Sequence, residues 1–157
     1  MRTLKSFFLI FTLFLILTIS TFSNIKTTID IEKIQSIGYS QFDNSNDNFI
    51  LFQKIRKEKN SKVVAFWNEP ELNATSISNA LVQENLKFFD VVNSFVHDRA
   101  LVTKYNLKNN TSIIAYDIVF QSKKNPQIFV SINFSGKVSL KKSEISALIN
   151  EAESFIK

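Results

Sequence analysis

Apolar side chains occur along the chain in short runs separated by polar segments, and each run predicts one helix or one strand. Runs rich in β-branched and aromatic residues predict strands, and apolar residues three or four positions apart predict helices. The predicted strands are residues 39–43, 61–69, 87–95, 111–120 and 127–134. The predicted helices are residues 48–58, 71–86, 97–107 and 139–157. Residues 24–38 are expected to be an extended or partly helical lead-in that ends at Gly38.

Spacing and capping residues support the first two helices. Phe49, Phe52 and Ile55 recur at helical spacing after an Asn-Asp pair that can cap a helix. Thr75 or Ser76 is the expected N-cap of the second helix. The run at 87–95 is so continuously apolar that it predicts a strand buried on both faces.

The last third of the chain predicts a β-hairpin that is covered by an amphipathic helix. One face of its second strand carries Ile128, Val130, Ile132 and Phe134. Ser143 is the expected N-cap of the closing helix. The apolar stripe of this helix consists of Ile145, Leu148, Ile149, Ala152 and Phe155. The full order, β-α-β-α-β-α-β-β-α, predicts an α/β domain with parallel strands joined by helical crossovers, followed by an antiparallel hairpin.

Residues 1–23 are set apart from this pattern. Two basic residues precede an apolar run that ends in small polar residues, which is typical of a secretory signal peptide cleaved after Ser23. The alternative is an uncleaved N-terminal anchor, and only then would the protein contact a membrane. The expected organisation is a signal peptide at 1–23, the lead-in at 24–38 and one domain at 39–157.

The amino-acid composition limits the reactions and the partners that can be expected of the chain. The chain has no cysteine, which excludes disulfides and redox thiol chemistry. Its net charge of +5 does not call for a nucleic-acid partner. The basic cluster between Lys54 and Lys62 is read as a solvated helix end, with binding to anionic glycans or lipid headgroups as the alternative.

Several strings together resemble the thioredoxin-like family over residues 39–157. "NFILFQKIRKEKNSKVVAFWNE" is similar to that family's first helix and central strand, and Phe66 and Trp67 stand where the family carries an aromatic pair. "FFDVVNSFVHDRALVTKYNLKNNTSIIAYD" is similar to the strand, short helix and strand that follow. The resemblance implies a central mixed sheet of four to five strands flanked by helices.

The departures from this family imply a redox-inactive member. Glu71 and Ala74 stand at the positions of the family's two cysteines, and Ala65 stands at the position of its buried acid. Thr111 replaces the cis-proline, so a trans bond is expected between Asn110 and Thr111. The chain would then resemble the non-catalytic domains of protein disulfide isomerases.

The resemblance also implies a peptide-binding wall. Its residues would be Trp67, Glu69, Pro70, Leu72, Asn110 and Thr111. An exposed Trp beside Pro and Leu suits an apolar peptide side chain, and free main-chain groups near Thr111 can pair with an extended chain. The structural alternative is that Trp67 packs on the second helix, that Leu72 is buried and that Glu71 only complements a helix N-terminus.

Other chemistry finds little support in the sequence. His97 is the only histidine and is read, with Asp98, as part of a helix cap, so no metal site is expected. No cofactor and no catalytic residue are predicted. The Asn-x-Ser/Thr acceptor positions for N-linked glycans are Asn73, Asn109, Asn110 and Asn133.

Three classes of function follow. The first is a non-catalytic binding module of the secretory pathway or cell exterior (the periplasm in a bacterium) that holds client polypeptides or a partner protein. The second is an enzyme of unrecognised type that uses Glu69 or Glu71 as a general acid or base. The third is a surface or secreted structural or host-interaction protein that binds anionic glycans. The oligomeric state and the identity of the partner are left open by the sequence.

Overall fold

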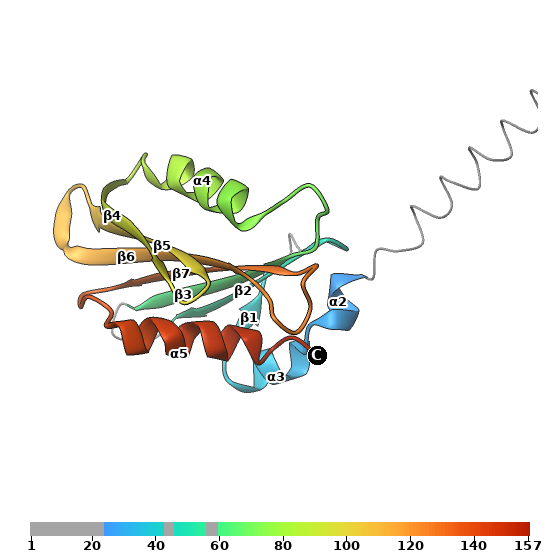
Figure 1. Cartoon of the computed structure of the whole chain (residues 1–157). Coiled ribbons are helices and arrows are strands. Elements are labelled where there is room, and N and C mark those ends of the chain that lie inside the picture. Colours follow the sequence, from blue (N-terminus) through green and yellow to red (C-terminus); the bar gives the residue numbers. More distant parts are fainter. Residues whose placement is uncertain (1–23, 43–45, 56–59) are drawn as a thin grey trace, which may run out of the picture.

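In a computed structural model, which describes residues 24–42, 46–55 and 60–157, the chain is built around one seven-stranded sheet (Figure 1). The strands are β1 (Ser40–Gln41), β2 (Phe49–Ile55), β3 (Ser61–Trp67), β4 (Phe89–His97), β5 (Ala100–Leu107), β6 (Asn110–Gln121) and β7 (Phe129–Gly136). The helices are α2 (Ile25–Thr28), α3 (Ile31–Ser36), α4 (Ala74–Asn85) and α5 (Lys142–Glu153). The predicted leader at 1–23 lies outside the described residues.

The strands lie in the order β1-β2-β3-β7-β6-β5-β4, and every pair of neighbours is antiparallel. Helix α4 covers one face of the sheet, and α5 covers the other together with the short helices α2 and α3 (Figure 1). Helix α4 carries the chain from β3 to the far edge of the sheet, where β4 begins a meander that brings β7 back beside β3.

This arrangement corrects the predicted fold class. A thioredoxin-like sheet of four to five mixed strands was expected, whereas the described strands form a seven-stranded antiparallel sheet. The crossover through α4 was expected to join neighbouring parallel strands. Three strands lie between β3 and β4, so the crossover creates no parallel pair. The thioredoxin-like architecture is therefore wrong for this chain.

Two predicted helices are strands. The segment expected as a helix at 48–58 forms β2, in which Ile50 and Phe52 face the core on the α5 side. Burial alternates along β2, with Phe49 and Leu51 half-buried between and beside the buried Ile50 and Phe52, but all four residues are apolar and the sequence shows no alternation. The segment expected as a helix at 97–107 is mainly β5, where Val102 and Tyr105 are buried on opposite faces.

Other elements were predicted correctly, including β3, α4, the β6–β7 hairpin and α5. Their caps differ from those expected. Asn73, rather than Thr75 or Ser76, caps α4 by accepting a hydrogen bond from the main-chain N–H of Ser76 at 2.9 Å. At the start of α5, the carboxylate of Glu144 accepts from the N–H of Lys141 at 2.7 Å. The expected N-cap of α5, Ser143, instead lies inside the helix.

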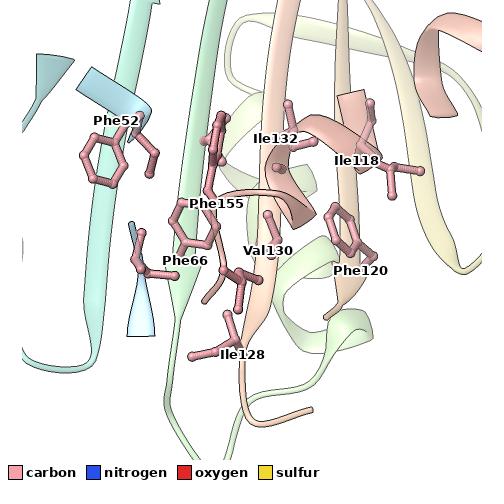
Figure 2. Close-up of a cluster of buried hydrophobic side chains, with 14 of the residues drawn as sticks. Phe52, Phe66, Ile118, Phe120, Ile128, Val130, Ile132 and Phe155 are labelled. Carbon is pink, nitrogen blue, oxygen red and sulfur yellow. The ribbon is translucent and has the colours of Figure 1, made fainter. Parts of the chain in front are cut away.

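The hydrophobic core lies between the sheet and α5 (Figure 2). The labelled members of this core are Phe52, Phe66, Ile118, Phe120, Ile128, Val130, Ile132 and Phe155. Each has at most 1% of its surface exposed. The predicted face of β7 is confirmed, because Ile128, Val130 and Ile132 are buried and Phe134 packs against the same cluster. The helix stripe is confirmed as well: Ile145, Ile149, Ala152 and Phe155 are buried, and Leu148 is partly buried.

Candidate functional site

The end of β3 and the β3–α4 loop together contain four of the residues predicted to bind peptide. Trp67 ends β3, its indole N–H donates to the hydroxyl of Ser131 at 3.0 Å, and its ring centroid lies 4.4 Å from that of Phe49. Beyond the loop is an open hollow of about 280 Å³. Its lining includes Asn68, Glu69, Pro70, Leu72, Pro126 and Phe129. Trp67 therefore packs on the neighbouring strands β2 and β7.

Asn110 and Thr111, the other two residues of that predicted wall, lie at the opposite end of the sheet. Trp67 pairs with Phe129, which pairs with Gln121 at the end of β6. Asn110 begins the same strand, 121 − 110 = 11 residues away. At about 3.3 Å per residue, the two ends are roughly 36 Å apart. The structure thus does not bring these two residues into one groove with Trp67, and their peptide bond is trans.

The residues at the predicted cysteine positions are separated by the start of a helix. Glu71 lies exposed in the loop, and Ala74 is the first residue of α4.

The glycan acceptor positions differ in accessibility. Asn109 and Asn110 are exposed where β5 turns into β6. Asn73 is exposed and caps α4. The side-chain nitrogen of Asn133 donates to the buried carboxylate of Asp117 at 2.8 Å. This side chain is half-buried and lies against a buried carboxylate, so Asn133 is the least suitable acceptor of the four.

Strand β4 is the long free edge of the sheet. Its exposed valines are Val91, Val92 and Val96, with 41%, 48% and 68% of their surface exposed. Phe88, just before the strand, is 63% exposed. Proteins usually protect sheet edges with short strands, lysine or proline. The opposite edge strand, β1, has two residues, whereas β4 has nine and contains neither Lys nor Pro.

The free side of β4 presents main-chain hydrogen-bonding groups. A two-residue turn with Asp98 at a φ of 53° joins β4 to β5. In such a turn the flanking pair, His97 and Ala100, exchanges main-chain hydrogen bonds. Main-chain groups alternate along a strand, so those of Ser94 and Val96 point away from β5. They can therefore pair with another extended chain.

A β-bulge shapes the middle of this edge. Val91 pairs with Tyr105 and Asn93 pairs with Lys104, which leaves Val92 without a partner in the ladder. Bulges at an edge limit pairing with other chains and redirect side chains. Here the bulge divides β4 into two short segments that can pair, one on each side of Val92.

A hollow of about 490 Å³ lies beside β4 on the α5 face of the sheet. Its lining includes Val92, Asn93, Phe95, Lys104, Tyr116 and Leu140. The ammonium group of Lys104 donates to the hydroxyl of Ser139 at 3.0 Å. In strand addition, main-chain hydrogen bonds supply affinity, and pockets for alternate side chains supply specificity. This hollow can take a side chain of an added strand.

The sequence prediction located this strand but not its exposure. The interpretation of 87–95 as a strand buried on both faces is wrong, because most residues of β4 are exposed at the edge of the sheet. Asp90, Asn93 and Ser94 within the apolar run were the available signal for an exposed strand.

A buried carboxylate lies beneath α4 and was not predicted. Asp117 of β6 is 1% exposed and accepts hydrogen bonds from the Tyr105 hydroxyl at 2.6 Å and the Asn85 amide at 2.7 Å. Asn133 is its third donor. Burial raises the pKa of Asp117, and the three donors offset part of this effect. Burial and the contact with Asp117 also raise the pKa of Tyr105. These internal bonds fasten α4 to the sheet and leave the carboxylate closed to a substrate.

Another polar cluster joins α5 to the β4–β5 turn. The hydroxyl of Ser146 lies 2.8 Å from Nε2 of His97 and 3.0 Å from Oδ2 of Asp98. A hydrolytic triad needs its acid on the ring nitrogen that faces away from the serine. Asp98 lies 3.4 Å from the same Nε2, so it does not orient the imidazole for catalysis. The expectation that His97 and Asp98 cap a helix is wrong, because His97 ends a strand.

The basic cluster is described only at its ends, since residues 56–59 lie outside the described residues. Lys62 pairs with Glu151 at 2.6 Å, and Lys54 donates to a main-chain carbonyl just after α3. Both ammonium groups lie 5.4 Å from the ring centroid of Tyr39. The adjacent hollow of about 330 Å³ is lined by these two lysines and by Glu144 and Glu151. Among the described residues of this lining, two lysines stand beside two glutamates.

No family model, curated protein or solved structure matches the chain. Among the described residues, no helix is long and apolar enough to span a membrane. The same residues hold no group of three or more acidic or histidine side chains placed to bind a metal ion. The free edge of β4 and its adjoining hollow are therefore the best-supported candidate site.

Proposed function

We propose that the protein is a polypeptide-binding module that accepts an extended segment as an additional antiparallel strand along β4. The single observation that carries this proposal is the nine-residue edge strand with exposed valines and neither lysine nor proline. Such an edge has both main-chain groups and apolar side chains without partners in the sheet.

The hollow beside β4 supports the same proposal. It lies on the α5 face next to β4, within reach of a side chain from an added strand, and Phe95, Tyr116 and Leu140 give it an apolar lining. The expected ligand is a short extended segment with apolar side chains at alternate positions. The signal peptide predicted at residues 1–23 adds a location to this proposal. An exported module would meet lumenal or extracellular polypeptides.

A peptide-display experiment tests the proposal. Random 12-residue peptides would be selected on the immobilised wild-type protein after depletion on Val96→Lys, and the affinities of the selected peptides would be measured by calorimetry. Val96→Lys places a charge on the free edge without removing a buried side chain. Ile55→Lys is the matched control, because Ile55 is 73% exposed and lies at the end of β2.

The proposal expects selected peptides with alternating apolar residues and micromolar Kd values. Val96→Lys should weaken binding at least tenfold, whereas Ile55→Lys should leave it unchanged. Selection of no peptide, or of peptides that bind both variants as well as the wild type, would refute strand addition at β4.

A further inference from the structure

We infer that the strand added to β4 is β4 of a second copy, so that two seven-stranded sheets join into one continuous antiparallel sheet. This inference rests on the proposed function and names the partner. A two-fold dimer uses the same patch on both copies, so an edge suited to it must complement itself. The sequence of β4 meets this requirement when Asp90 faces His97 and Val91 faces Val96 of the second copy.

The bulge restricts the registers in which facing side chains share a face of the sheet. In an antiparallel strand pair, residues that face each other must have side chains on the same face of the sheet. Asp90 pairs with Asn106 and His97 pairs with Ala100. Asn106 and Ala100 lie an even number of residues apart in β5, so they share a face. Asp90 and His97 therefore share a face too, although their own numbers differ by seven.

The same reasoning applies to the valines. Val91 pairs with Tyr105 and Val96 pairs with Leu101, and these two β5 residues share the α4 face. An uninterrupted strand would place Val91 and Val96 on opposite faces. The bulge at Val92 thus makes the two ends of β4 match each other across a two-fold axis.

In the resulting register, Asp90 faces His97 of the second copy, and Val91 faces Val96 of the second copy. Each contact occurs twice, once on each side of the axis. A shift of the register by one residue would set Asp90 opposite Val96, on the other face of the sheet. The pairing thus combines an acid with an imidazole and an apolar residue with an apolar residue. Polar residues, Asn93 and Ser94, lie at the axis, where the two bulges interrupt the ladder.

Two short ladders separated by bulges form a small interface, so a weak dimer with a micromolar Kd is expected. Analytical ultracentrifugation of the full chain would measure it across a range of concentrations. The wild type and Ile55→Lys should dimerise alike, whereas Val96→Lys should weaken dimerisation at least tenfold.

Disulfide trapping tests the register directly, because the chain has no cysteine of its own. The double variant Val91→Cys/Val96→Cys should form a covalent dimer under mild oxidation. Facing residues that exchange main-chain hydrogen bonds have Cα atoms about 5.5 Å apart, which suits a disulfide. Within one chain the two positions are about 16 Å apart, too far for an internal bond. Val91→Cys and Val96→Cys alone should stay largely uncrosslinked, as should Ile55→Cys.

The outcomes separate this inference from the proposed function. A protein that stays monomeric at all concentrations while selected peptides bind β4 would overturn the dimer and leave strand addition intact. A dimer unaffected by Val96→Lys, or equal crosslinking of single and double variants, would likewise overturn the inference. A wild-type protein that neither dimerises nor binds any selected peptide would refute the two together.

Discussion

Replacing Asp117 by alanine should destabilise the protein by about 3 kcal/mol. The substitution removes an acceptor shared by three side chains. Tyr105 is 0% exposed, so its hydroxyl would lose its partner without reaching water, at a cost of about 1–3 kcal/mol. Asn85 and Asn133 are half-buried, and each would lose a bond worth about 1 kcal/mol. Part of this loss is offset because a buried carboxylate is no longer desolvated.

Asp117→Asn is the matched control for this substitution. It keeps the volume and one acceptor oxygen, so it should cost only about 1 kcal/mol. Guanidinium unfolding followed by the fluorescence of Trp67, the only tryptophan, would measure both variants. Equal effects of the two variants, or effects below about 0.5 kcal/mol, would refute the assignment of a shared buried acceptor.

The difference in stability between the wild type and Asp117→Asn, measured as a function of pH, tests the raised pKa of Asp117. Burial raises the pKa of Asp117 above its ordinary value of 3.8 in the folded state. The unfolded chain therefore releases this proton at lower pH, and the stability contributed by Asp117 falls as the pH rises from 3.8 through the folded pKa. The wild type should thus lose stability relative to Asp117→Asn on going from acid to neutral pH. A difference that changes in the opposite direction would mean that the three donors outweigh burial.

Three further substitutions test the packing of the remaining elements by the same unfolding assay. Glu153→Gln should cost about 1–2 kcal/mol at pH 7. Burial opposes ionisation of Glu153, but hydrogen bonds and the Arg99 guanidinium at 2.7 Å outweigh it and lower its pKa, so this cost should vanish as the pH falls through the folded pKa. Asn73→Ala should cost about 1 kcal/mol through loss of the α4 cap, whereas Asn73→Ser should cost little. Phe66→Ala should cost about 3–5 kcal/mol, because this ring is fully buried; a cost below 1 kcal/mol would contradict its place in the core.

Local sequence correctly predicted the elements whose apolar periodicity matches the faces that they bury in the folded protein. Strand β7 alternates between the core and the α4 face, and α5 buries a single stripe, so both kept their expected periodicity. The sequence of β2 shows no such periodicity, because "FILF" is apolar at every position although burial alternates along the strand. Its phenylalanines also fit helical spacing, so the local pattern does not distinguish a strand from a helix.

Strand order is set by contacts between segments that are distant in sequence, and this is why the predicted fold class is wrong. The local order of helices and strands fits a parallel crossover and a long antiparallel meander equally well. One overlooked signal was the Asp-Arg pair between two β-rich runs, which forms the two-residue turn between β4 and β5. Asp98 tolerates the positive φ that this turn requires. A two-residue turn at this position predicts a strand after it, in place of the predicted helix at 97–107.

The candidate site depends on the same long-range order. Trp67, Glu69, Pro70 and Leu72 are close in sequence and lie together, but Asn110 reaches them only in a thioredoxin-like sheet. No local pattern shows that β4 ends the sheet. The position of β4 at the edge follows from the order of all seven strands.

Amide hydrogen exchange of Val96 tests the central claim most directly. It would be measured by NMR in dilute protein, in concentrated protein and with a selected peptide. If β4 is a free edge that accepts another strand, this amide exchanges fast in dilute protein and at least tenfold more slowly when a second copy or a peptide is bound. An amide that is already protected in dilute protein, or that stays fast in all three samples, would contradict the account.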